Sequence, residues 1–139
     1  MPVPTSSDIV SYDYAVVRVV PLVDREEFIN AGVILFCRTR RFLAAAVNLD
    51  EARLLALAPD LDVNDVRCHL DLIPKICQGG EQAGPIGQQI QAERFHWLTA
   101  PRSAVIQCSP IHSGLCLDPE SALNHLFETM VSPPAAPIG

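Results

Sequence analysis

The sequence has a single lysine, few aromatic residues and no long apolar run. Lys75 stands against nine arginines, and 16 acidic side chains outnumber 10 basic ones, which gives a net charge of −6 and a pI near 5.0. Such an acidic balance works against sequence-independent binding of nucleic-acid phosphates. No apolar run approaches the ~18 residues of a membrane span, and the opening residues, MPVPTSSDIV, have no basic export-signal region. The composition therefore predicts a soluble, cytoplasmic protein.

Disulfide and metal motifs are lacking as well. The five cysteines are an odd number, and no CxxC pair occurs. Free thiols, mostly buried in the core, are the expectation. Cys108, His112 and Cys116 are evenly spaced, but a structural zinc site needs a fourth ligand, and the spacing matches no common zinc module. We expect no metal and no cofactor.

The motifs that identify a reaction are also missing. The chain contains no glycine-rich phosphate loop, no HExxH motif and no GxSxG elbow. Composition and spacing therefore do not specify a reaction, and a role other than catalysis is favoured.

What the sequence does contain is enough apolar material for one domain. Its 139 residues are 49% hydrophobic and 19% charged, and a chain of this length buries roughly two-thirds of its unfolded surface without disulfide or metal staples. Strands are predicted where β-branched and aromatic residues gather, over 12–20, 31–38, 42–47, 104–108 and 114–117. The second of these is apolar on both faces, which predicts a central, covered strand.

Three helices are predicted from apolar stripes and capping residues. Asn48 is expected to cap the first, which Pro59 ends; Asp62 begins the second; and Asp118 caps the last. Residues 92–98 fit either a short helix or an extended segment. The sum predicts an α+β fold, a single domain over 11–131 with an antiparallel sheet of about four or five strands and about three helices packed on it. Residues 1–10 are expected to be a flexible arm and 132–139 a proline-rich tail.

One group of candidate functional residues lies near the start of the predicted domain. Arg25, Glu27 and Asn30 belong to a charged turn, where carboxylates could do acid–base work or simply be solvated. Arg18 lies in an apolar strand, so its charge must be paired or exposed: Glu26 or Glu27 could be its partner, or the strand could simply lie at the edge of the sheet.

A second group lies in the segment 93–113, which holds two arginines, two histidines and the only tryptophan. Arg94 and Arg102 could clamp an anion, and His96 or His112 could transfer protons near neutral pH. Ser103 beside a histidine would be a conceivable nucleophile. The alternative is structural: Trp97 anchors a connection while the arginines satisfy backbone carbonyls and helix ends.

The stretches YDYAVVRVVP, REEFINAGVILFCRTRRFL, ERFHWLTAPRS and SPIHSG resemble a bacterial family known as domain of unknown function 3037. The resemblance runs from about Tyr12 to Leu126 and implies no established activity. It implies a protein partner, because such proteins are often encoded beside a HipA-like kinase. The family pattern falls on Arg25, Glu27, Asn30, Gly32, Arg94, Trp97, Pro101, Arg102, Ser103, His112, Gly114, Asp118 and Pro119.

Two hypotheses about function follow. The favoured one is an accessory interaction module that binds a HipA-like kinase or a similar protein. The other is a small enzyme or ligand-binding domain that acts on an anionic, nucleotide-like substrate through its arginines and histidines. Nucleic-acid binding through Arg38, Arg40 and Arg41 is a weaker third, which the net charge opposes. The sequence does not determine whether the protein forms a homo-oligomer.

Overall fold

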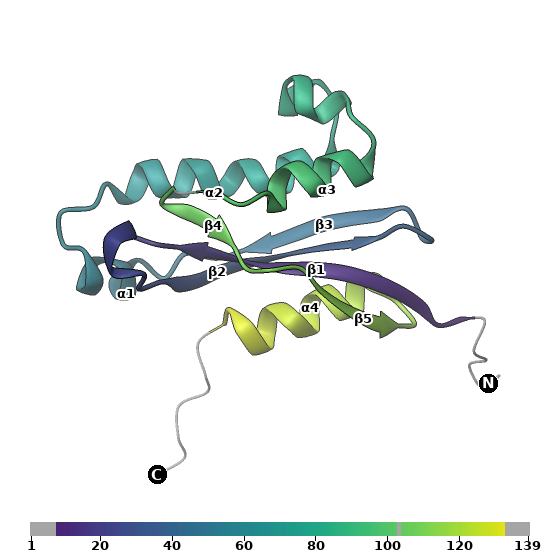
Figure 1. Cartoon of the computed structure of the whole chain (residues 1–139), viewed down its shortest axis with the longest axis horizontal. Helices are drawn as coiled ribbons and strands as arrows, with labels where there is room; N and C mark the ends of the chain where they lie inside the picture. Colours follow the sequence, from purple (N-terminus) through teal and green to yellow (C-terminus); the bar gives the residue numbers. More distant parts are fainter. Residues whose placement is uncertain (1–7, 103, 133–139) are drawn as a thin grey trace, which may run out of the picture.

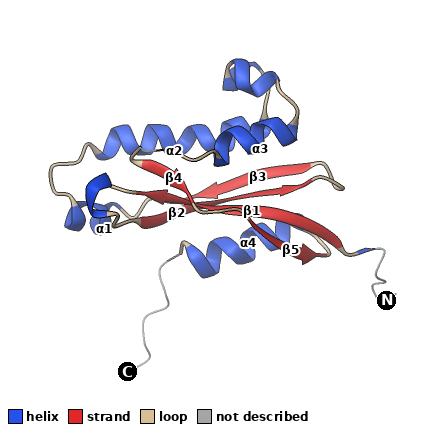
Figure 2. Ribbon diagram, in the orientation of Figure 1, coloured by secondary structure: helices blue, strands red, loops and turns tan. Residues whose placement is uncertain are grey.

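A five-stranded antiparallel sheet forms the middle layer of the molecule, as the computed structural model of residues 8–102 and 104–132 shows (Figures 1 and 2). Helices lie on both of its faces. The strands are β1 (Val10–Val19), β2 (Ile29–Cys37), β3 (Phe42–Val47), β4 (Ile106–Cys108) and β5 (His112–Cys116). The helices are α1 (Glu51–Leu57), α2 (Val63–Gln78), α3 (Gln91–Thr99) and α4 (Pro119–Met130). The predicted α+β domain with an antiparallel sheet is confirmed, whereas most of the predicted arm and tail falls outside the described residues.

The strand order is β3-β2-β1-β4, with β5 also pairing β1. Since β2 takes one edge of β1, both late strands share the other edge. β4 pairs the C-terminal end of β1, with Val17 opposite Cys108, and β5 pairs its N-terminal half, with Tyr12 opposite Gly114. β2 lies between two strands and is buried almost throughout, as its apolar faces predicted.

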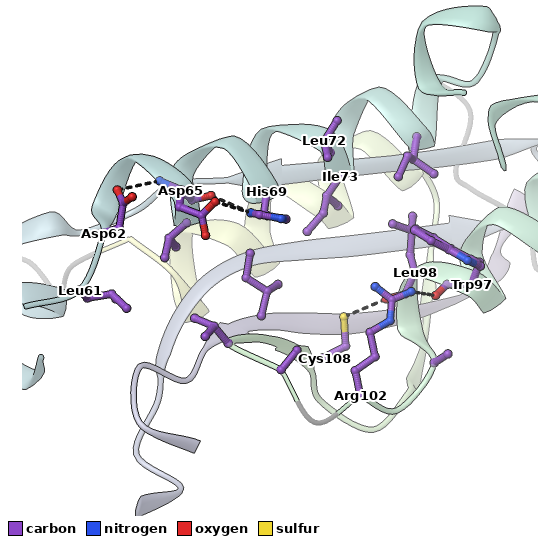
Figure 3. Close-up of a pocket in the computed structure, with 16 residues that line it drawn as sticks. Leu61, Asp62, Asp65, His69, Leu72, Ile73, Trp97, Leu98, Arg102 and Cys108 are labelled. Atoms are coloured by element: carbon purple, nitrogen blue, oxygen red, sulfur yellow. Dashed lines mark hydrogen bonds and ion pairs between the residues drawn. The ribbon is translucent and has the colours of Figure 1, made fainter. Parts of the chain in front are cut away.

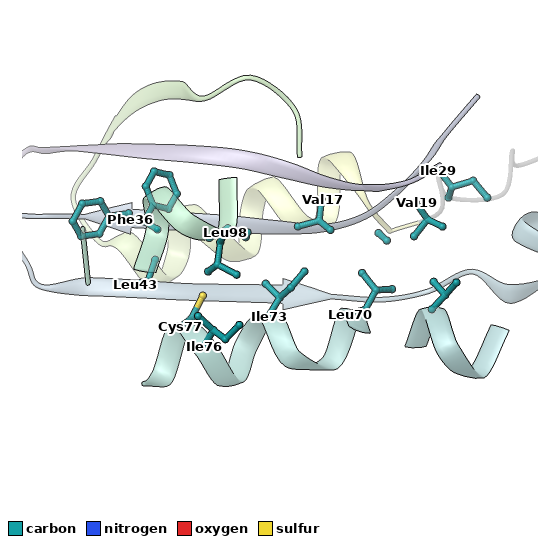
Figure 4. Close-up of a cluster of buried hydrophobic side chains, with 14 of the residues drawn as sticks. Val17, Val19, Ile29, Phe36, Leu43, Leu70, Ile73, Ile76, Cys77 and Leu98 are labelled. Carbon is teal, nitrogen blue, oxygen red and sulfur yellow. The ribbon is translucent and has the colours of Figure 1, made fainter. Parts of the chain in front are cut away.

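One face of the sheet packs against α2 and α3. Val17 and Val19 of β1 point to this side, in the period-two alternation expected of a strand, and belong to the same hydrophobic cluster as Leu70 and Ile73 of α2 (Figure 4). α2 continues through Pro74 to Gln78. Of the two hydrophobic clusters among the described residues, this is the larger.

The other face packs against α4. Leu123 and Leu126 of the helix bury themselves against Val33 and Leu35 of β2. Asp118 occupies the N-cap position, as predicted, and the Ser121 hydroxyl donates a hydrogen bond of 2.8 Å to its carboxylate. The apolar stripe read from the sequence therefore identifies the buried face of α4.

One local prediction is wrong, and one choice that the sequence left open is resolved. The first helix begins at Glu51 and is capped by Asp50, whose carboxylate accepts from the Arg53 backbone N–H at 3.1 Å. Asn48 lies two residues before this cap, and its own N–H bonds the Ala31 carbonyl at 2.8 Å, which extends the β2–β3 ladder. The ambiguous segment around 92–98 is helical, as α3, which makes four α-helices within the described residues.

Candidate functional site

Arg94, a candidate anion ligand, is instead buried at the C-terminal end of α2. Its Nη1 donates to the carbonyls of Ile76 at 2.8 Å and Cys77 at 2.6 Å, and its Nε donates to the Gln89 carbonyl at 2.9 Å. The last carbonyls of a helix have no partner within the helix and carry its negative dipole end, so a buried guanidinium satisfies both needs. The side chain of Arg94 is thereby taken up in holding the fold.

The backbone around Arg94 is shaped to admit it. Gly79 ends α2 with φ +77°, and a Cβ there would lie 2.8 Å from the Arg94 Nη1. Beyond it, the glycine-rich stretch after α2 forms two 3₁₀ turns, Glu81–Ala83 and Pro85–Gln88, closed by a Gly80 N–H to Gly87 carbonyl bond of 2.9 Å. A glycine is required at position 79 because of both the left-handed backbone and the guanidinium.

Arg102, the second candidate anion ligand, lies in the exposed connection after α3. Its guanidinium carbon sits 4.4 Å from the centre of the Trp97 ring, and its Nη2 donates to the Trp97 carbonyl at 2.5 Å. Trp97 is 43% exposed, so this stacked pair presents a large aromatic face to solvent. His96 is exposed on the same helix, and Ser103 lies outside the described residues.

The Trp97–Arg102 pair lies at one end of a groove of about 400 Å³ between α2 and β4 (Figure 3). The groove exists because α3 is too short to cover the whole strip of sheet beside α2: at ~1.5 Å per residue its 9 residues span roughly 14 Å against roughly 24 Å for the 16 residues of α2. Most of the lining side chains are apolar: Leu61, Val66, Leu72, Ile73, Ile76, Leu98, Ala100, Ala104, Val105, Ile106 and Cys108. We call this surface the α2–β4 groove.

The two ends of the α2–β4 groove differ in charge. At the N-terminal end of α2 lie Asp62 and Asp65, and the Nδ1 of His69 approaches an Asp65 carboxylate oxygen at 3.6 Å. At the opposite end lies Arg102, as Figure 3 shows. The groove therefore has an acidic end, an apolar middle and a basic end.

The thiol inside the groove is not an activated nucleophile. Burial raises the pKa of Cys108 to about 11, although Arg102 and Arg18 pull it down. The same cause raises the pKa of Cys77 to about 12, against a smaller opposing effect of Arg94. Both side chains are neutral thiols at physiological pH, and a neutral thiol is a poor nucleophile and metal ligand. Cys108 also packs with the α2 face whereas Cys116 packs with the α4 face, so the evenly spaced trio of the sequence does not share a site.

Arg18 and Asn30 come together on the other side of the sheet. They are register partners across the β1–β2 pair, where the ladder has an irregularity. The Arg18 guanidinium carbon lies 4.2 Å from the Phe28 ring centre, and the Asn30 amide nitrogen donates to the Met130 carbonyl at 3.1 Å. Among the described residues, neither the Arg18 Nε nor the Asn30 Oδ1 has a hydrogen-bond partner. Neither alternative considered from the sequence is found: among the described residues no ion pair joins Arg18 to Glu26 or Glu27, and β1 lies between β2 and the two late strands.

The remaining candidates lie at the surface. Arg25 pairs with Glu27 at 2.5 Å, on side chains that are 66% and 41% exposed, so the charged turn is a solvated ion pair. His112 lies on β5 with its ring 5.4 Å from that of Tyr14. The arginines and histidines of the sequence thus belong to separate parts of the molecule.

Sequence reasoning missed most of the α2–β4 groove. The signal available was a second stripe on α2, comprising Asp62, Asp65, His69, Leu72 and Ile76 at alternating spacings of three and four. It runs beside the stripe that packs on the sheet. Leu72 is 45% exposed, which a helix with only one buried face does not explain.

Comparisons with known proteins place the chain in a family. Residues 14–131 match the family model described as a protein of unknown function, DUF3037. No curated protein and no solved structure matches the chain. In the part of the chain that the structure describes, no helix has the length and apolar character to cross a membrane. Because the family match covers most of the sequence, the chain belongs to the DUF3037 family.

Proposed function

We propose that this protein is an interaction module that binds a partner protein through the α2–β4 groove. The observation that carries the proposal is the half-exposed Trp97, held against Arg102 at the end of an apolar groove. Tryptophan and arginine are among the residue types most enriched in binding hot spots. A ring already fixed by its neighbour loses less conformational entropy when a partner covers it.

The surroundings of the groove support binding more than catalysis. Arg94 donates to three carbonyls, so it is not available to an anionic substrate. The Cys108 thiol is held in its neutral form. What the groove offers is apolar area with charged groups at its ends, which suits recognition of a partner surface.

The partner we propose is a HipA-like kinase, because the family resemblance implies that such a kinase is often encoded nearby. A stable complex buries ~1,200–2,000 Å² in total, and the groove with its rim would supply the central, desolvated part of that contact.

The test is co-expression of the chain with the HipA-like kinase encoded nearest to it, followed by size-exclusion chromatography. We expect co-elution, weakened at least about tenfold by Trp97→Ala, since hot-spot truncations cost ~2 kcal/mol or more. The matched control is Leu115→Ala: Leu115 is 72% exposed on β5 and does not line the groove. Separate elution of the two wild-type proteins at micromolar concentration would reject the kinase as partner. Equal weakening by both variants would reject the groove as the contact.

A further inference from the structure

The outer edge of β4 carries backbone groups that point away from the sheet. The Val20 N–H donates to the Val105 carbonyl at 2.6 Å, and the Ser109 N–H donates to the Val16 carbonyl at 2.8 Å. Residues 105 and 109 therefore turn their backbone polar groups towards β1. Because these groups alternate along an antiparallel strand, those of Ile106 and Cys108 face outward. Within the described residues, no strand pairs with this side of β4.

The same two residues place their side chains in the α2–β4 groove. Ile106 and Cys108 are the register partners of Val19 and Val17, and all four side chains belong to the α2 face of the sheet. A chain added beside β4 would continue that alternation, so every second side chain would enter the groove. One short strand, β4, therefore has both outward-facing backbone donors and acceptors at its edge and an apolar groove beside it. Proteins that bind a peptide by strand addition use this combination.

The charges at the two ends of the groove determine which charged side chains of an added peptide fit there. Arg102 favours an acidic side chain at one end, and Asp62 and Asp65 favour a basic side chain at the other. From Asp65 to Ile76 the helix rises roughly 16 Å, at ~1.5 Å per residue. An extended peptide covers this length in about five residues, at ~3.3 Å each.

We propose that the groove binds an extended peptide segment of the partner, which adds to β4 as a further strand. Its alternate apolar side chains fill the groove, and an acidic and a basic residue flank them. This inference rests on the proposed function and specifies its mode of binding.

The experiment selects binders from a phage-displayed library of random nine-residue peptides on the immobilised full chain. We expect enriched sequences with apolar residues at every second position between one acidic and one basic residue. Ile106→Pro removes an outward N–H and crowds the edge, so it should weaken binding of the enriched peptides about tenfold or more. Ile106→Val keeps the N–H and most of the side chain, so it should bind within about twofold of wild type. Enriched sequences with helical three-and-four spacing, no enrichment, or equal binding by both variants would overturn strand addition.

Amide hydrogen exchange gives a second reading that does not depend on a proline variant. Binding of an enriched peptide should slow exchange at the Ile106 and Cys108 amides by about tenfold or more, while the Gln107 amide, which faces β1, changes little. Protection spread over α2 without change at these two amides would contradict the proposal.

Failure of this inference is distinguishable from failure of the proposed function. If the kinase complex forms equally well with Ile106→Pro and Ile106→Val, the module binds its partner but not by strand addition. If the library gives the expected peptides and the kinase does not bind, strand addition holds and the partner is a different protein.

Discussion

Arg94 and Arg102 come from the same arginine- and histidine-rich stretch, yet they do opposite things. Arg94 is buried and donates to three carbonyls from two segments of chain. Arg102 is exposed and holds the Trp97 ring at the end of the α2–β4 groove. The difference lies in their neighbours: a helix end with unpaired carbonyls draws one guanidinium inside, whereas the other has an aromatic face beside it and water around it. Residue type alone therefore does not distinguish a structural arginine from a functional one.

The largest expected effect is a loss of stability on substitution of Arg94. Arg94→Ala leaves three carbonyls without their donor, and unsatisfied buried groups cost ~1–3 kcal/mol each, so the free energy of unfolding should fall by about 3 kcal/mol or more. Urea denaturation followed by circular dichroism measures this. Arg94→Lys should recover only part of the loss, because an ammonium lacks the planar fork. A loss below about 1 kcal/mol for Arg94→Ala would show that the buried guanidinium is not a structural support.

A substitution at Gly79 tests whether this residue and Arg94 contribute to stability together or independently. Gly79→Ala puts a Cβ at φ +77° and 2.8 Å from the Arg94 Nη1, and we expect a loss of about 1–3 kcal/mol in stability. The part of that cost due to the clash should vanish in the Arg94→Ala background, whereas the strain of the positive φ should remain. Full additivity of the two losses in a double-mutant cycle would mean that the two residues do not interact.

Substitutions in the α2–β4 groove should show the reverse of those around Arg94. They should weaken partner binding more than they lower the free energy of unfolding. Arg102→Met keeps an apolar stem but removes the cation beside Trp97, so the stability change should stay near or below about 0.5 kcal/mol. Binding of the partner should weaken about threefold to tenfold, because the ring loses the group that orients it. Chromatography of the co-expressed pair and thermal melting of the free variant provide the two measurements. A melting change as large as that of Arg94→Ala would make Arg102 a structural residue as well.

The smallest effect is a difference in thiol labelling. Cys77 lies near Arg94 and Cys108 near Arg102, and burial raises their pKa values to about 12 and about 11. At pH 8 both are protonated and should react with iodoacetamide more slowly than the exposed Cys68, with the rate rising only as the pH approaches those values. The partner should slow labelling of Cys108 further and leave Cys77 unchanged. Mass spectrometry of labelled peptides resolves the three positions; protection of Cys77 by the partner would place the contact elsewhere.

The sequence was sufficient to predict those helices and strands that depend on interactions between residues close together in the chain. The apolar stripe of α4 depends on neighbouring residues, and it predicted the buried face of that helix correctly. The role of Arg94 depends on carbonyls at positions 76, 77 and 89, which only the packing of α3 against α2 brings together. The α2–β4 groove was missed for the same reason, since it arises from the unequal lengths of two helices above a strand order that the sequence does not reveal; the second stripe on α2 marks only one of its walls.

The pairing of β1 also sets an order of events during synthesis. Its first edge is satisfied by β2, a close neighbour in the chain, but its second edge waits for residues 106–116, and the Val16 N–H bonds the Ser109 hydroxyl across a separation of 93 residues. Contacts between distant residues close late, because the loop entropy is lost before the contact is gained. Until β4 and β5 have left the ribosome, the nascent chain exposes a long, largely apolar strand edge of the kind that recruits other chains into aggregates. Chains that stop before residue 106 should therefore be aggregation-prone, and the strand that borders the groove should be among the last parts of the fold to form.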